Sequence, residues 1–239
     1  MPVTDPAAPP EIRDRLAIAL DVDDLDDAVA LARRVAPWFG IAKVGLELYT
    51  VAGPVAFARM HELGLRVFAD LKLHDIPTTV ERASRAAARH GVEFLNMHAA
   101  GGVAMLRAGI EGARAGARDH APAMLAVTVL TSDADTSAFS SRLDATIAAG
   151  CDGVVCSAHE VHTVKERDAS LRAMVPGVRL EGDARDDQAR VATPADVVAA
   201  GGDWLVLGRA VTRAARPEHA AATVVASLHD GLKTASHLR

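Results

Sequence analysis

The sequence predicts a single-domain (β/α)8 barrel, and three observations lead to this α/β fold class. From Arg15 onward, short apolar runs alternate with longer amphipathic or alanine-rich stretches, without a linker-like break. Eight such runs occur, which is the number of strands that closes a barrel. Consecutive runs begin roughly one βα unit apart, and continuous apolar strands are typical of a parallel sheet covered on both faces.

The composition is that of a globular protein. Of the 239 residues, 50% are hydrophobic and 24% are charged, which suffices for a full core. The net charge of -5 and the pI near 6.0 argue against electrostatic binding to nucleic acid or to anionic lipid, because both require clustered Lys and Arg in excess. We therefore expect neither nucleic acid nor a membrane among the partners.

Cysteine usage and the start of the chain bear on location. Cys151 and Cys156 are too few for a disulfide framework or a four-ligand zinc site, so a reducing cytoplasm is the expected location. The first residues lack the basic and apolar regions of a signal peptide, and no apolar run approaches the length of a membrane span. We expect residues 1–14 to be a flexible N-terminal tail and residues 15–239 to form the barrel.

The expected strands are the eight apolar runs. In order, they are residues 16–22, 41–45, 66–71, 93–98, 123–130, 152–156, 172–175 and 203–208. The seventh run is short and is followed by Pro176 and Gly177, so it is assigned partly because the architecture needs it.

Helical patterns lie between these runs. Leu25, Val29, Ala32 and Ala36 fall on one helical face, and Gly91 is placed as a C-terminal cap. The alternative architecture is an open doubly wound sheet. That fold would normally have fewer strands and a glycine-rich turn after the first one, where this chain has Asp21-Val22-Asp23.

Active sites of such barrels lie at the carboxyl ends of the strands, so polar residues at those ends are the candidates. They are Asp21, Lys43, Asp70, Lys72, His98, Thr131, Gly208 and Arg209.

The segment FADLKLHDIPTTV is the most informative of these. Asp70 and Lys72 lie two residues apart at a strand end, so their side chains should point to the same side, toward the barrel mouth. Asp75 follows in a loop, with Pro77 in the first helical turn. Each residue also has a purely structural interpretation: the first two as an ion pair, and Asp75 as a helix N-cap.

Asp21 and Lys43 are expected at the same end of the barrel as Asp70 and Lys72. This makes a purely structural interpretation of the whole set harder to accept. Like charges about 4 Å apart repel by roughly 4 kcal/mol at an effective dielectric near 20. Alternating Asp and Lys side chains removes that cost. Such an array would keep Lys72 protonated and place Asp70 opposite a negative charge brought in by a substrate.

The successive motifs IALDV, KVG, DLKLHDIPTT, VTVLTS, PGVR, Asp187-Gln188 and LGR resemble those of the orotidine 5′-monophosphate decarboxylase family. They occur in order over nearly the whole chain after the tail. The resemblance implies decarboxylation of orotidine 5′-monophosphate to uridine 5′-monophosphate, without a metal or an organic cofactor.

Individual roles follow from the resemblance alone. It implies that Lys72 donates the proton within a charge network of Asp21, Lys43, Asp70 and Lys72. It implies a homodimer in which the neighbouring chain contributes Asp75 and Thr79 near the ribose. The residues implied to contact the pyrimidine or the 5′-phosphate are Thr131, Arg179, Gln188, Gly208 and Arg209.

The phosphate assignment also has a physical basis. Gly208 allows close backbone approach, Arg209 can bind two oxygens, and both begin a predicted helix whose N–H groups favour an anion. A glycine turn beside a surface arginine is the structural alternative. Residues 177–190 are long and polar, and they could close over the phosphate as a mobile lid.

Two other functions share parts of this pattern. A metal-dependent sugar-phosphate decarboxylase or synthase of the same suprafamily would carry an acidic ligand on the second strand, where this chain has Lys43. A nucleotide-sensing barrel without activity would not need Lys72. His159 and His162 are expected to face solvent rather than a metal, and His74 and His98 are expected to orient their neighbours.

Overall fold

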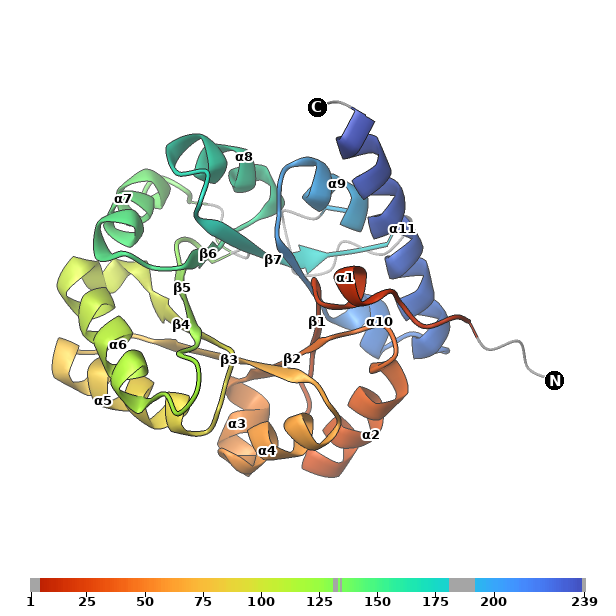
Figure 1. The fold of residues 1–239 in the computed structure, drawn as a ribbon, viewed down its shortest axis with the longest axis horizontal. Coiled ribbons are helices and arrows are strands. Elements are labelled where there is room, and N and C mark those ends of the chain that lie inside the picture. Colours follow the sequence, from red (N-terminus) through yellow and green to blue (C-terminus); the bar gives the residue numbers. More distant parts are fainter. Residues whose placement is uncertain (1–4, 131–132, 134, 181–191, 238–239) are drawn as a thin grey trace.

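The computed structural model describes residues 5–130, 133, 135–180 and 192–237. Its centre is a closed barrel of eight parallel strands in sequential order, surrounded by helices (Figure 1). The strands are β1 (Leu16–Ala19), β2 (Ile41–Gly45), β3 (Arg66–Leu73), β4 (Phe94–His98), β5 (Ala123–Val127), β6 (Gly153–Val155), β7 (Arg172–Val178) and β8 (Trp204–Leu207). The predicted (β/α)8 barrel is confirmed, and the open sheet is excluded because β8 pairs with β1.

A helix precedes β1, and helices follow every strand. They are α1 (Pro10–Arg13), α2 (Leu25–Val35), α3 (Leu46–Ala52), α4 (Val55–Glu62), α5 (Pro77–Arg89), the 3-10 helix η1 (Ala99–Gly101), α6 (Gly102–Gly116), α7 (Phe139–Ala149), α8 (Ala158–Arg167), α9 (Pro194–Ala199), α10 (Arg209–Thr212) and α11 (Pro217–His237). Local signals explain their bounds: the Asp24 carboxylate caps α2, and Gly91, with φ +76°, follows the end of α5 as predicted. None of the described helices is long and apolar enough to cross a membrane.

Aromatic side chains close the amino-terminal end of the barrel. Phe68, Phe94 and Trp204 belong to the buried cluster inside the strands, and we call these three the aromatic plug. The rings of Phe94 and Trp204 meet edge to face, with centroids 4.9 Å apart. Arg66 and Arg172, the first residues of β3 and β7, lie over Phe94 and Trp204. The barrel interior is therefore filled at this end by aromatic side chains.

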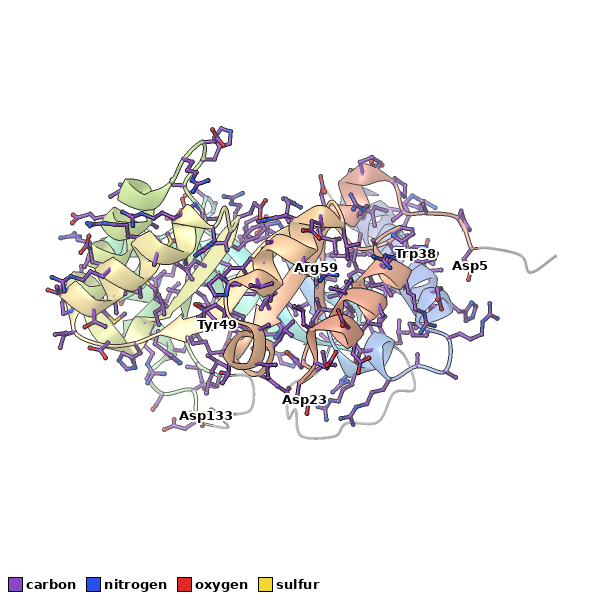
Figure 2. The ribbon with its side chains drawn as sticks, turned by 90° about the horizontal axis from the view of Figure 1, so that it is seen from below. Asp5, Asp23, Trp38, Tyr49, Arg59 and Asp133 are labelled. Atoms are coloured by element: carbon purple, nitrogen blue, oxygen red, sulfur yellow. The ribbon has the colours of Figure 1, made fainter. Side chains whose placement is uncertain are left out.

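The segment before β1 differs from the expected flexible tail. Ala8 and Ile12 are buried, and Trp38 Nε1 donates a hydrogen bond to the carbonyl oxygen of Pro6 at 2.8 Å. The segment thus packs against the loop that follows α2, where Figure 2 labels Trp38. The prediction of a tail is wrong for residues 5–14, because burial of Ile12 gives this segment a fixed contact.

The seventh strand is real and longer than predicted. It continues through Pro176 and Gly177 to Val178, although we expected it to end at Val175. Gly177 has φ +77°, and the register against β8 shifts between Val175 and Val178. This irregularity accommodates a proline inside the strand.

Candidate active site

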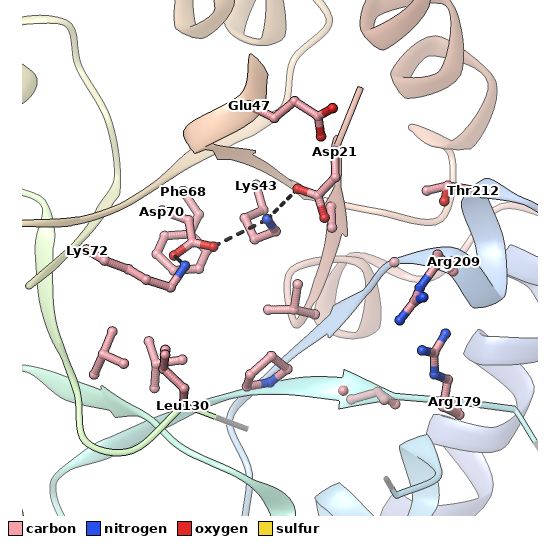
Figure 3. Close-up of a pocket in the computed structure, with 18 of the residues that line it drawn as sticks. Asp21, Lys43, Glu47, Phe68, Asp70, Lys72, Leu130, Arg179, Arg209 and Thr212 are labelled. Carbon is pink, nitrogen blue, oxygen red and sulfur yellow. Dashed lines mark hydrogen bonds and ion pairs between the residues drawn. The ribbon is translucent and has the colours of Figure 1, made fainter. Parts of the chain in front are cut away.

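A cavity of about 480 Å³ opens at the carboxyl ends of the strands, above the aromatic plug. Every strand except β4 contributes to its lining. The cavity brings together the predicted residues Asp21, Lys43, Asp70, Lys72, Arg179, Gly208 and Arg209 (Figure 3).

Four charged side chains alternate in sign along one wall, in the expected order. Lys43 Nζ lies 2.8 Å from Asp21 Oδ1 and 3.3 Å from Asp70 Oδ2. Lys72 Nζ lies 2.6 Å from Asp70 Oδ1. Lys43 and Asp70 are buried, whereas Asp21 lies in the loop after β1 with 55% of its side chain exposed. We call Asp21, Lys43, Asp70 and Lys72 the charge array.

The array determines the ionisation of its buried centre. Burial alone would lower the pKa of Lys43, but the carboxylates of Asp70 and Asp21 outweigh burial and raise it above its usual value. Burial alone would raise the pKa of Asp70, but Lys43, Lys72 and hydrogen bonds lower it. Both groups are therefore charged near neutral pH, and the array is a fixed row of full charges.

The end of β3 departs from regular strand geometry at Lys72. Ala69 pairs with Leu95 and Leu73 pairs with Met97, so β3 advances four residues where β4 advances two. Lys72 has φ +48°, the only positive φ of a non-glycine residue in the described ranges. Regular alternation, from which we predicted that Asp70 and Lys72 share a side, does not hold here, and a bulge turns both toward the cavity.

Asn96 lies opposite this bulge, and our sequence analysis missed it. It is the middle residue of β4 and is 0% exposed. Its Oδ1 accepts a hydrogen bond from the backbone N–H of Lys72, and its Nδ2 donates one to Asp70 Oδ1, each at 2.7 Å. An amide between the apolar residues Leu95 and Met97 was the signal that could have identified it.

Two arginines define the opposite side of the cavity. Figure 3 shows the guanidinium groups of Arg179 and Arg209 turned toward each other, away from Lys72. A β-carbon added to Gly208 would lie 3.8 Å from its nearest neighbour, Ala19, so bare backbone lines the cavity there. The helix predicted to start at Arg209 exists as α10 but has only four residues. Attraction for an anion therefore comes mainly from the guanidinium groups.

Two predicted residues lie outside this cavity in their own chain. Asp75 and Thr79 are exposed, and neither belongs to the lining. Asp75 is not a helix N-cap, because the N-cap of α5 is Ile76; its Oδ1 instead accepts the N–H of Ile76 at 2.6 Å. Two further predicted residues, Thr131 and Gln188, lie outside the described residues, as does most of the expected lid over residues 177–190.

The cavity has further polar lining that the sequence analysis did not single out: Glu47 on α3, Thr212 on α10 and Arg213 after it. Thr212 and Arg213 follow the end of β8 by five and six residues, and Glu47 follows the end of β2 by two, so none of them stands at a strand end.

His74 and His98 lie close to the charge array but do not line the cavity. The rings of His74 and His98 lie 5.5 Å apart beside the array. Burial, followed by the charges of His74, Lys72 and Arg142, lowers the pKa of His98, so this ring is neutral near pH 7. His162 is exposed on α8 and pairs with Glu166 at 3.2 Å. Among the described residues, no group of three or more His, Cys, Asp or Glu side chains is placed to hold a metal ion.

Known sequences provide an independent comparison. A family model described as "Orotidine 5'-phosphate decarboxylase / HUMPS family" matches residues 14–224. The orotidine 5'-phosphate decarboxylase of Nitratidesulfovibrio vulgaris is 46% identical over 230 residues, which cover 89% of this chain and 97% of that protein. The enzyme of the same name from Moorella thermoacetica is 44% identical over 90% of this chain and 92% of its own length.

Solved structures agree with the sequences. The crystal structure of orotidine 5'-phosphate decarboxylase from Lactobacillus acidophilus matches with a TM-score of 0.78 at 30% identity, covering 90% of this chain and 99% of that one. An uncharacterized conserved protein from Geobacillus kaustophilus matches with a TM-score of 0.76 at 35% identity, over 89% and 99% of the two chains. The chain therefore belongs to the orotidine 5'-phosphate decarboxylase / HUMPS family.

Proposed function

We propose that this chain decarboxylates orotidine 5′-monophosphate to uridine 5′-monophosphate, the last step of de novo pyrimidine biosynthesis. The observation that carries the proposal is one cavity with Lys72 on one side and Arg179 and Arg209 on the other. A nucleoside monophosphate has its base and its phosphate at opposite ends, which suits this separation. The names of the relatives in Nitratidesulfovibrio and Moorella support the same assignment.

Lys72 is the centre of the proposed mechanism. The bond between ring carbon 6 and the carboxylate breaks, and its electron pair stays on carbon 6, which has no easy resonance sink. The Lys72 ammonium stabilises that charge and then donates a proton to carbon 6. Carbon dioxide and uridine 5′-monophosphate result, and the neutral amine regains a proton from solvent.

The rest of the array keeps this ammonium in place. Asp70 holds Lys72 Nζ at 2.6 Å and is itself fixed by Lys43. Beside the departing carboxylate, Asp70 also opposes its negative charge, which favours its loss as neutral carbon dioxide. Asp21 and Lys43 face the ribose in this scheme. A fixed row of charges needs no rearrangement during the reaction.

The arginine side holds the 5′-phosphate. Arg179, Arg209 and the bare backbone at Gly208 offer charged donors and close approach. We assign Gln188 to the phosphate, Thr131 to the pyrimidine and residues 177–190 to a closing lid from sequence alone. Binding energy gathered at the phosphate can be used to hold the reacting ring against Lys72.

No metal takes part in the proposed reaction, because Lys72 supplies both charge and proton. The position of Lys43 supports this over a metal-dependent sugar-phosphate decarboxylase. Its ammonium lies between the carboxylates of Asp21 and Asp70, where a cation would otherwise bind. We also propose a cytoplasmic location, in keeping with the buried thiols of Cys151 and Cys156.

The reaction is tested by the ultraviolet absorbance of orotidine 5′-monophosphate incubated with chelator-treated protein. We expect conversion by the wild type and by Lys165→Ala, and a loss of at least about 10³-fold in kcat for Lys72→Ala. Lys165, on α8, is the matched control, because it pairs with Asp203 just before β8 and does not line the cavity. No conversion by folded wild type would reject the assignment and favour a sugar-phosphate substrate with magnesium, or a nucleotide-sensing role.

We further propose a homodimer in which Asp75 and Thr79 complete the site of the partner chain. Both are exposed near the mouth of a cavity that they do not line in their own chain. Large apolar side chains are exposed on α3, on α4 and in the segments after β3 and β5: Leu46, Val51, Val55, Ile76 and Leu130. Ile76 is 67% exposed and adjacent to Asp75. A subunit interface that buries Ile76 would therefore also include Asp75.

Mixing two inactive variants tests the shared site. Asp75→Ala and Lys72→Ala are each expected to be nearly inactive, but a hybrid dimer contains one site with both native residues. Random exchange should restore about a quarter of the wild-type activity. Mixed and exchanged proteins that stay inactive would place Asp75 in its own chain's site or outside catalysis.

A further inference from the structure

We propose that Asn96 is a positioning residue that sets the direction in which the Lys72 side chain extends from β3. The inference rests on the proposed function, since it assigns Asn96 a role in presenting the proton donor. Asn96 does not line the cavity, so it acts through Lys72 and Asp70 rather than on the substrate.

The first support is that one buried amide contacts both partners of the reacting pair. Asn96 Oδ1 accepts the Lys72 backbone N–H, and Nδ2 donates to Asp70 Oδ1, both at 2.7 Å. The orientation of the amide is fixed by these partners, because the flipped form would face a donor with a donor and a carboxylate with an oxygen. Asn96 thus ties the backbone of Lys72 to the carboxylate that holds its ammonium.

The second support is the backbone of Lys72. A lysine with φ +48° is in the left-handed region, which is unfavourable for residues with a β-carbon. In a regular ladder the backbone of β4 would bond this part of β3. Here the register shifts between Ala69 and Leu73, and the Asn96 side chain accepts the N–H that the bulge exposes. The amide therefore stabilises the conformation that turns Lys72 toward the cavity.

The third support is the crowding at one carboxylate oxygen. Asp70 Oδ1 accepts from Lys72 Nζ at 2.6 Å as well as from Asn96. Two donors on one oxygen define where it lies, and Lys43 occupies the other oxygen. Without Asn96, both Asp70 and the bulge would lose a fixed contact at the same time.

Asn96→Leu removes both hydrogen bonds with little change in volume. We expect kcat for orotidine 5′-monophosphate to fall by about 100-fold, because small misplacements of a reacting group cost that much. KM and the affinity for uridine 5′-monophosphate should change by less than about threefold, because the arginine side is untouched. A kcat within about threefold of the wild type would overturn the proposal.

Thr128→Val is the matched control. Thr128 is also fully buried, just past the end of the neighbouring strand β5, but its hydroxyl bonds to the Val155 carbonyl at 3.4 Å rather than to the array. We expect this variant to keep the wild-type kcat. An equal loss in both variants would mean that any buried polar group at this end of the barrel matters, and it would overturn the specific role of Asn96.

Asn96→Asp provides a second variant whose effect depends on pH. A carboxylate beside Asp70 repels it, and one of the two pKa values must rise. Once protonated, the new carboxyl donates to Asp70 and accepts from the Lys72 N–H, as the amide does. The ratio of variant to wild-type kcat should therefore increase as pH falls from about 8 to 5. His74, His98, Lys43 and Lys72 surround this pair in both proteins, so their effects on kcat largely cancel in the ratio. A ratio that stays flat would contradict the proposal.

Crystal structures of wild type and Asn96→Leu separate this inference from the proposed function. We expect residue 72 to leave the left-handed region and Nζ to leave Asp70 Oδ1 in the variant. An unchanged bulge would overturn the positioning role, even if the wild type does not decarboxylate orotidine 5′-monophosphate.

Discussion

The Lys43 ammonium occupies the space that the absent side chain of Gly45 leaves. A β-carbon on Gly45 would lie 3.0 Å from Lys43 Nζ and 3.1 Å from Asp21 Oδ1. The glycine at the end of β2 thus makes room for the ion pair that starts the charge array. The array depends on a small residue as much as on its charged ones.

Gly45→Ala should therefore disturb the array without unfolding the barrel. We expect kcat/KM for orotidine 5′-monophosphate to fall about tenfold, since Lys43 must shift by a few tenths of an ångström. Steady-state kinetics would measure the loss in kcat/KM, and thermal unfolding would check that the barrel stays folded. Gly64→Ala is the contrast: it has φ +70° and open space, so it should lose about 1 kcal/mol of stability and keep its kcat.

Arg209→Ala should lose recognition of the phosphate rather than chemistry. A charged hydrogen bond contributes about 1.5–3 kcal/mol, so kcat/KM for orotidine 5′-monophosphate should fall by about 100-fold. Orotidine, which lacks the phosphate, should react equally slowly with variant and wild type. Arg216 is an exposed arginine outside the lining. Arg216→Ala should therefore prefer orotidine 5′-monophosphate over orotidine as strongly as the wild type does. Equal losses on both substrates would place Arg209 elsewhere in the mechanism.

Acid should weaken the fold through Asp70. Its pKa is lowered in the folded chain, so its ion pairs stabilise the protein above the usual value of 3.8 and lose that contribution as pH falls through the lower folded pKa. Asp70→Asn should be less stable by about 3 kcal/mol at pH 7, and the difference should shrink below about pH 4. Urea unfolding at several pH values measures both. A difference independent of pH would show that Asp70 acts through packing alone.

Alkali should act through Lys43 with the opposite sign. Because the pKa of Lys43 is raised, its charge stabilises the fold below the usual value of 10.5, and this contribution is lost as pH rises through the higher folded pKa. Lys43→Met should be destabilised at pH 8, and its deficit relative to the wild type should narrow above about pH 10.5. Lys165→Met serves as the comparison, because its partner Asp203 is more exposed than Asp70, the buried partner of Lys43.

The barrel and most of the cavity could be predicted because their signals are local. Polar residues stand within or just after the apolar runs, as Asp21, Lys43, Asp70 and Arg209 do. The bulge could not be predicted, because its left-handed residue is Lys72, and lysine gives no sign of that conformation. A glycine there would have been a clear signal.

Residues whose partners are distant in sequence were also missed. Asn96 bonds to groups 24 and 26 positions away, and only the pairing of β3 with β4 brings them together. The packing of Ile12 had no periodic pattern to reveal it, since the helix containing it has four residues. Both depend on tertiary contacts that hydrophobic periodicity does not record.

The aromatic plug closes the cavity toward the amino-terminal end of the barrel. Phe68, Phe94 and Trp204 fill that end, so among the described residues the cavity reaches solvent at the carboxyl ends of the strands. A nucleotide product still seated there excludes the next substrate. Product and substrate should compete for the free enzyme, and turnover can be no faster than product release.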